Sequence, residues 1–114
     1  MDVDADELRL LLARAPGLTA AALRALVPTL AAVQTLLGPG AAAREALATL
    51  PEAARRGFSA PDRVAIAADW QWLRRSPVVL IDCFSRLYPP LLAAIADAPP
   101  VLFVRGDPAV LATP

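Results

Sequence analysis

Apolar residues recur at helical spacing through the first two thirds of the chain. One helical face carries Leu8, Leu11, Leu12 and Ala15, and "APGL" at residues 15–18 predicts the turn that ends this helix. A second apolar series runs on to Leu37, and we expect Pro28 to divide it into two helices, lying in the first turn of the second. The "GPG" at residues 38–40 then ends the series.

Three capping signals predict further helix starts. Thr19 suits the N-cap of the helix that follows the first turn. Thr49 with Glu52, and Ser59 with Asp62, have the spacing of capping boxes, in which a hydroxyl and a carboxylate satisfy free backbone N–H groups. The second box is expected to open the clearest helix of the chain.

These patterns predict a mainly α fold, with a compact bundle of four or five short helices between about residues 8 and 75 and no β-sheet there. The predicted interior consists of Leu11, Leu23, Leu26, Leu30, Val33, Ile66, Trp70 and Leu73.

The pattern changes after Pro77. Two short β-rich runs, "VVLI" at residues 78–81 and "VLFV" at residues 101–104, flank the helix-like "PLLAAIA". Such continuous apolar runs are typical of buried parallel strands, so the segment has a βαβ outline. A sheet of two strands leaves its edges and faces without cover, so we expect these strands to border a larger sheet. The apolar surface and strand edges left uncovered should favour a weak homodimer. The expected organisation is a helical domain over residues 1–76 and a small α/β extension over residues 77–114.

Composition limits the class of protein. The chain has 114 residues, enough for one ordinary domain, and 57% of them are apolar. The longest uncharged run, residues 25–43, is broken by Pro28 and "GPG", which argues against a transmembrane helix. The acidic start "MDVDADE" is unlike a signal peptide, and the single Cys83 cannot form an internal disulfide. A cytoplasmic protein is expected.

Zero net charge conceals an uneven distribution. All eleven basic residues are Arg, and residues 8–76 hold nine of them against four acids, a net charge of about +5. Arg55, Arg56 and Arg63, together with Arg74 and Arg75, are candidates for a strip that contacts the phosphates of DNA. The alternative is that they lie on solvated helix faces, which commonly carry such charges.

Catalytic chemistry has few candidates. The chain has no His, no CxxC, no glycine-rich phosphate loop and no nucleophile elbow, so we expect neither catalytic nor cofactor nor metal-binding residues, and no enzyme. Cys83 is expected to be a passive apolar residue. "PGLT" at residues 16–19 resembles half of a helix-hairpin-helix motif, with an ordinary inter-helix turn as the alternative.

The two tryptophans are separated by one residue, so they point to different faces of a helix. Trp70 is expected in the core, and Trp72 is expected to cover the junction with the later segment. No two aromatic residues have a spacing in the sequence that would let them stack successive bases of a single strand.

Eight positions between residues 88 and 106 fit the spacing Y-P-x-x-L-x-x-I-x-D-x-P-x-x-L-x-x-x-G. They are Tyr88, Pro89, Leu92, Ile95, Asp97, Pro99, Leu102 and Gly106. This pattern resembles the bacterial DNA-processing protein A family (DprA, also called Smf). "DWQWL" at residues 69–73 is similar to the helix before this motif in proteobacterial members, and "APGL" resembles the family's first helical turn. The resemblance covers the whole chain and is strongest from Asp69 to Asp107.

The resemblance implies a protein of three parts. Family members have a sterile-alpha-motif-like (SAM-like) helical domain, then a Rossmann-like domain that binds single-stranded DNA and dimerises, and often a winged helix. They protect incoming single strands in natural transformation and help to load the recombinase RecA. The Rossmann-like domain, with its Gly-Ser-Arg loop, would begin just beyond Pro114, and no position of this chain matches the family's DNA-binding residues. Tyr88, Pro89 and Pro99 are expected to shape the backbone rather than to contact a ligand, since proline fixes φ and Pro-Pro cannot enter the centre of a strand ladder.

Two functions remain open at this stage. The chain is either the N-terminal interaction and regulatory part of a DprA-type protein, with single-stranded DNA and RecA as partners of the whole, or a free-standing helical protein-interaction domain with no role on DNA. In both cases a protein partner is expected for the helical part, with weak or no DNA binding of its own.

Overall fold

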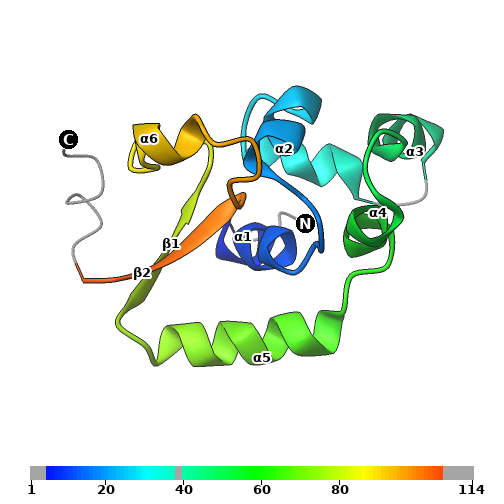
Figure 1. Ribbon diagram of the computed structural model, residues 1–114. Helices are drawn as coiled ribbons and strands as arrows, with labels where there is room; N and C mark the ends of the chain where they lie inside the picture. Colours follow the sequence, from blue (N-terminus) through cyan, green and yellow to red (C-terminus); the bar gives the residue numbers. More distant parts are fainter. Residues whose placement is uncertain (1–4, 38–39, 107–114) are drawn as a thin grey trace.

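The computed structural model describes residues 5–37 and 40–106, and about half of the chain is helical (Figure 1). The elements along the chain are α1 (Ala5–Ala13), α2 (Ala20–Leu26), the 3₁₀-helix η1 (Ala31–Leu36), α3 (Ala41–Leu47), α4 (Glu52–Ser59), α5 (Arg63–Arg74), β1 (Val78–Asp82), α6 (Pro90–Ala93) and β2 (Val101–Arg105). The fold is mainly α, as predicted, with one small sheet. Between residues 8 and 75 the described residues form no strand, which confirms the expected helical part.

Local signals correctly placed several helix ends. The Thr19 hydroxyl accepts a hydrogen bond from Ala22 N and caps α2, and the preceding turn contains Gly17 at a φ of 79°. Helix α2 ends at Leu26, before Pro28, so the division was predicted correctly. Pro28 itself lies before the second helix rather than in its first turn, and that helix is 3₁₀. Gly38 and Pro39 of "GPG" lie outside the described residues.

Both predicted capping boxes are wrong, because their hydroxyl residues belong to the preceding helices. Thr49 lies in the turn that closes α3, where Leu50 N bonds Leu47 O, and α4 begins after Pro51 without a side-chain cap. Ser59 ends α4, and its hydroxyl donates to Arg55 O. Asp62 does cap α5, since its carboxylate accepts from Ala65 N at 3.0 Å.

Helix α1 lies at the centre of the molecule. Leu8, Leu10, Leu11 and Leu12 are each at most 2% exposed, so the second half of this helix is buried around more than one face. It contacts α4, α5, η1 and both strands, and Figure 1 shows it enclosed by these elements. Complete burial of each leucine contributes about 2 kcal/mol relative to an exposed position.

The predicted interior largely agrees with the structure. Five of the eight predicted residues are buried, namely Leu11, Leu23, Val33, Ile66 and Leu73. Leu26, Leu30 and Trp70 are half-buried and pack against the core. The sequence pattern missed the contribution of Phe58, which is 1% exposed.

The two strands pair antiparallel, which corrects the parallel βαβ outline. Val78 faces Arg105 and Asp82 faces Val101 across the ladder. The connection of 18 residues would be long enough for a parallel return, but it stays at one end of the strands. Cys83 N bonds Pro100 O there, so the chain returns to the end of β1 that it has just left.

The helical part and the strand pair share one hydrophobic core. Leu80, Ile81 and Val101 of the strands join the same buried cluster as the leucines of α1. The change from helix to strand falls between α5 and β1, near the boundary expected at residue 76. That residues 1–76 and 77–114 are separate domains stays a prediction.

Candidate functional site

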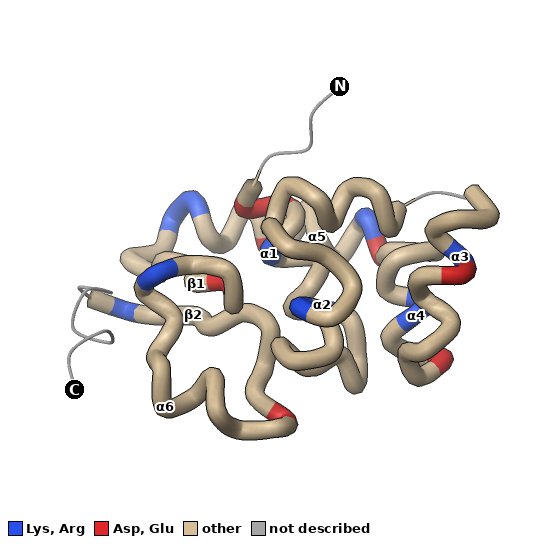
Figure 2. Tube along the Cα trace, turned by 90° about the horizontal axis from the view of Figure 1, so that it is seen from above, with Lys and Arg blue, Asp and Glu red and all other residues tan. Residues whose placement is uncertain are grey.

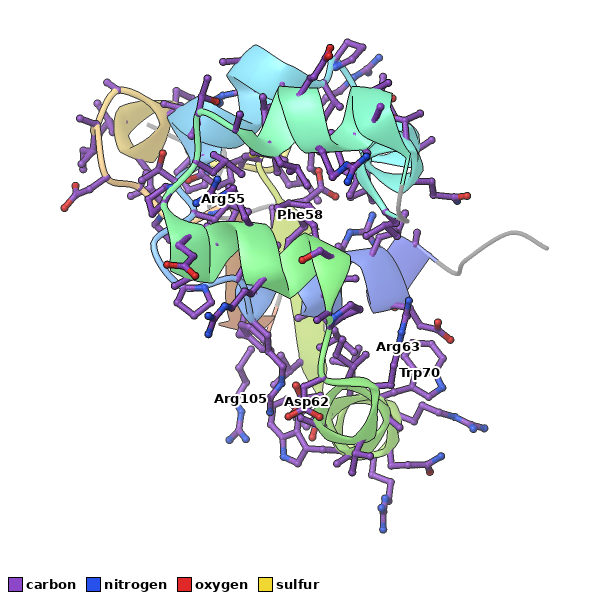
Figure 3. All side chains as sticks on the ribbon, turned by 90° about the vertical axis from the view of Figure 1, so that its right-hand side faces the viewer. Arg55, Phe58, Asp62, Arg63, Trp70 and Arg105 are labelled. Carbon is purple, nitrogen blue, oxygen red and sulfur yellow. The ribbon has the colours of Figure 1, made fainter. Side chains whose placement is uncertain are left out.

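The predicted arginine strip is dispersed in the structure. Arg55 and Arg56 belong to α4 and Arg63 opens α5. Figure 3 shows Arg55 and Arg63 on opposite sides of the α4 ribbon. Arg56 donates to Glu52 at 3.0 Å in an exposed ion pair. Figure 2 shows basic residues distributed over the described trace, without one face that collects them. The binding of DNA by these three residues stays a prediction.

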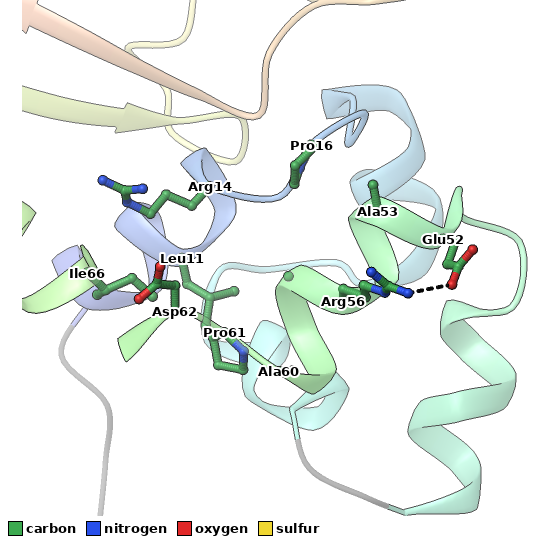
Figure 4. A pocket seen from close by; sticks show the side chains of 11 residues that line it. Leu11, Arg14, Pro16, Glu52, Ala53, Arg56, Ala60, Pro61, Asp62 and Ile66 are labelled. Carbon is green, nitrogen blue, oxygen red and sulfur yellow. Dashed lines mark hydrogen bonds and ion pairs between the residues drawn. The ribbon is translucent and has the colours of Figure 1, made fainter. Parts of the chain in front are cut away.

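A hollow of about 460 Å³ lies between the end of α1, α4 and the turn before α5 (Figure 4). Its lining consists of Leu11, Arg14, Pro16, Glu52, Ala53, Arg56, Gly57, Ala60, Pro61, Asp62 and Ile66. Asp62 uses its carboxylate to cap α5, and Glu52 binds Arg56. The charged lining groups therefore already have protein partners, so the hollow offers little polar binding capacity.

Arg14 connects the rim of this hollow to α5. Its Nε and Nη2 donate to the two carboxylate oxygens of Asp69 at 2.5 and 2.9 Å. These hydrogen bonds raise the pKa of Arg14 and lower the pKa of Asp69. Asp69 opens the "DWQWL" segment, and the structure gives it a role in fixing α5 to α1.

A second ion pair connects α1 to the strands. Asp82 is 3% exposed, accepts from Arg9 Nε at 2.8 Å, and accepts from Phe84 N at 2.9 Å. Arg9 also donates to Asp6 at 2.7 Å. Burial lowers the pKa of Arg9, but the bonds to Asp82 and Asp6 outweigh it and leave that pKa raised. Arg9 thus compensates the buried charge of Asp82 and also binds Asp6.

The family-motif residues shape the loop between the strands. Tyr88 is buried, and its hydroxyl donates to the carbonyl of Pro99 at 2.7 Å, which ties the two ends of the loop together. Burial raises the pKa of Tyr88. Pro89 occupies the N-cap position of α6, and Gly106 has a φ of 98° directly after β2. These contacts and backbone angles shape the loop, and the structural role of the motif as a whole stays a prediction.

The other motif residues differ in exposure. Leu92 and Leu102 are half-buried against the core, whereas Ile95 is 50% exposed and Asp97 is exposed. The arginine Arg24 lies over the Tyr88 ring, with its guanidinium carbon 6.0 Å from the ring centroid. The loop therefore also contacts α2, which carries Arg24.

Reactive groups are scarce among residues 5–37 and 40–106. No group of three or more His, Cys, Asp or Glu side chains is placed to hold a metal ion in this part of the chain. Cys83 is buried, and burial raises the pKa of its thiol to about 11. Its thiolate is therefore scarce at neutral pH. The described helices include none that is long and apolar enough to cross a membrane.

Sequence spacing missed an exposed aromatic pair. Trp72 near the end of α5 and Phe103 on β2 are 48% and 50% exposed, and their ring centroids lie 6.4 Å apart. Trp72 thus covers the junction with the later segment, as expected, although half of it stays in solvent. The partners are 31 positions apart in sequence, and only the antiparallel return of β2 brings them together.

No protein-family model, no curated protein and no solved structure matches this chain.

Proposed function

We propose that this chain is the N-terminal interaction and regulatory part of a DprA-type protein that binds single-stranded DNA in the cytoplasm. The observation that carries the proposal is the run of eight motif positions from Tyr88 to Gly106. The structure supports it in one respect, because Tyr88, Pro89, Pro99 and Gly106 all serve the geometry of one loop. If the residues of a family motif contact no ligand, they should instead set the geometry of the backbone, as these four residues do.

The proposed architecture assigns the described helices before Pro77 to a SAM-like domain. Short helices that surround a buried central helix support this assignment. The strand pair would then border the Rossmann-like sheet that follows in the family. In the whole protein, single-stranded DNA and RecA are the proposed partners, and this part contributes no catalysis.

The first test is the coding sequence that follows Pro114. We expect an apolar strand and then a Gly-Ser-Arg loop. The second test uses the intact product, which should shorten the lag of RecA assembly on single strands coated with single-strand-binding protein. Residues 1–114 alone serve as the control and should leave the lag unchanged. A stop codon after Pro114, or an intact product without effect on RecA, would contradict the proposal.

A second candidate function is a free-standing protein-interaction domain. Exposed apolar side chains favour it, since Trp72, Val79 and Phe103 are each at least 42% exposed. Under this alternative the coding sequence ends near Pro114, and the isolated chain has no affinity for DNA. The same two tests therefore distinguish the candidates.

A further inference from the structure

The exposed pair formed by Trp72 and Phe103 is flanked by cationic groups. Arg75 follows Trp72 by three residues at the end of α5, so the two side chains lie on the same side of the helix. Arg105 follows Phe103 by two residues on β2, so they share one face of the strand. Figure 3 shows Arg105 beside α5, on the side opposite to Trp70. We refer to Trp72, Phe103, Arg75 and Arg105 as the aromatic–arginine patch.

The arginines of this patch are not neutralised within the described chain. The ion pairs between described residues are Arg9 with Asp6 and Asp82, Arg14 with Asp69, and Arg56 with Glu52. Arg75 and Arg105 are exposed and appear in none of them, and Arg75 Nε donates only to the Gln71 carbonyl. The nearest acid along α5, Asp69, is bound by Arg14. The patch therefore combines apolar ring surface with positive charge that no described acid compensates.

The geometry points to single-stranded DNA as the ligand of this patch, with bases stacked on the two rings and phosphates beside the two guanidinium groups. The rings are inclined at 48° to each other, so they cannot enclose one base between parallel planes, but each presents a half-exposed face to its own base. Bases of a duplex stack on each other, so only a single strand has free faces to offer. Anionic phosphates complement Arg75 and Arg105.

This inference rests on the proposed function and deepens it, because it gives the N-terminal part its own contact with the strand. The site is small. Two arginines that each neutralise one phosphate give a slope of about −1.4 in log affinity against log salt concentration. The patch is therefore an auxiliary contact rather than the principal binding site of a whole protein.

The test measures binding of a fluorescently labelled oligothymidylate to the 114-residue chain by anisotropy, together with quenching of its tryptophan fluorescence. Trp72→Ala and Phe103→Ala should each weaken binding at least about fivefold, since each removes one stacked base. Trp72→Phe keeps a ring and should retain most of the affinity. Arg75→Ala and Arg105→Ala should each reduce the salt slope by about 0.7.

Two matched controls locate the effect. Leu91→Ala removes an apolar side chain that is 83% exposed on α6, and Arg44→Ala removes an exposed arginine on α3. Both should leave the affinity unchanged. Circular dichroism verifies that each variant is folded, and Trp72→Phe remains informative if Trp72→Ala is not.

Several outcomes would overturn the inference. They are equal affinity for a duplex of the same length, absence of tryptophan quenching, loss of binding in Arg44→Ala but not in Trp72→Ala, and no detectable binding at all. The last outcome would assign the patch to a protein partner. None of them affects the proposed function, which is decided by the coding sequence beyond Pro114 and by the effect of the intact product on RecA.

Discussion

Asp82 is the buried charge that joins the helices to the strands. Its two oxygens accept from Arg9 Nε and from Phe84 N, and the residue is almost completely excluded from water. A buried carboxylate is tolerated only when its hydrogen bonds are made, so this position is sensitive to any change in its partners. The sequence gives no sign of the pair, because 73 residues separate Arg9 from Asp82.

Asp82→Ala should lower the free energy of unfolding by about 2–3 kcal/mol, because a charged hydrogen bond to Arg9 and the cap on Phe84 N are both lost. Urea denaturation followed by circular dichroism measures the change. Glu52→Ala is the control, since it breaks an ion pair whose side chains are 74% and 69% exposed. That variant should be indistinguishable from the wild type. If both variants lost the same free energy of unfolding, burial of Asp82 would not explain the contribution of its ion pair.

Asp69 should make stability depend on acid pH. Arg14 lowers the pKa of this carboxyl below its ordinary 3.8. A carboxyl whose pKa is lower in the folded state stabilises the fold above its unfolded pKa, and the contribution is lost as the pH falls through the folded pKa. The difference in melting temperature between wild type and Asp69→Asn should therefore be largest at neutral pH and shrink as the pH falls below 3.8. A difference that stays constant in acid would show that the pair acts through packing alone.

At the scale of elements, α4 approaches the end of α1 through a glycine. A Cβ built on Gly57 would lie 2.9 Å from the Cβ of Ala15 and 3.0 Å from its Cα. Both neighbouring atoms belong to a short, buried residue that cannot rotate away. The two helices can therefore pack at this distance only because position 57 has no side chain.

Gly57→Ala should destabilise the protein by about 1–2 kcal/mol, although alanine is the better helix former, because overpacking outweighs the gain in helix propensity. Thermal denaturation measures it. Gly40→Ala is the control, since nothing lies within 4 Å of the added Cβ there. At this N-cap position alanine caps the helix slightly less well than glycine, which lowers the free energy of unfolding. Alanine also restricts the unfolded chain, which raises that free energy, so the two small effects oppose each other. Similar melting temperatures for the two variants would argue against the close contact.

Local signals predicted the elements better than their arrangement. Thr19 caps α2 as expected, because an N-cap depends on atoms two or three residues away, whereas Asp62 caps α5 in place of the expected Ser59. The predicted parallel direction of the strands was wrong, because an apolar run does not indicate whether a strand pairs parallel or antiparallel. The hydrogen bond between Tyr88 and Pro99 holds the loop at one end of the strands. The contact of Trp72 with Phe103 depends on that loop, so the aromatic–arginine patch was beyond prediction from spacing.

At the scale of the whole molecule, the strand pair leaves apolar side chains exposed, and no further described strand pairs with β2. Leu80, Ile81 and Val101 are buried by the protein's own helices, but Val79 and Phe103 are 42% and 50% exposed. Cys83 N bonds Pro100 O, and alternation along an antiparallel ladder then directs the N–H of Phe103 away from β1. An exposed strand edge of this kind favours pairing with another chain.

Light scattering should therefore show some dimer of the 114-residue chain at high concentration. Val79→Lys should reduce the dimer, because it places a charge on the exposed strand. Val64→Lys is the matched control, as this valine is 83% exposed on α5, away from the strands. A chain that stays monomeric at every concentration would count against a sheet that normally continues beyond β2.

Under the proposed function, the strength of DNA binding should distinguish this part from the intact protein. Affinity for single strands grows with the number of phosphates neutralised, and the arginines of the described chain are scattered, with Arg9, Arg14 and Arg56 already paired to acids. We expect the 114-residue chain to bind an oligothymidylate at least about tenfold more weakly than the intact protein, with a shallow salt dependence. Titrations of both proteins at two salt concentrations measure this. Tight binding by the short chain that collapses in an Arg55→Ala, Arg56→Ala, Arg63→Ala triple variant would show a DNA site in the helical part itself, since these three positions lie apart from the aromatic–arginine patch along the chain.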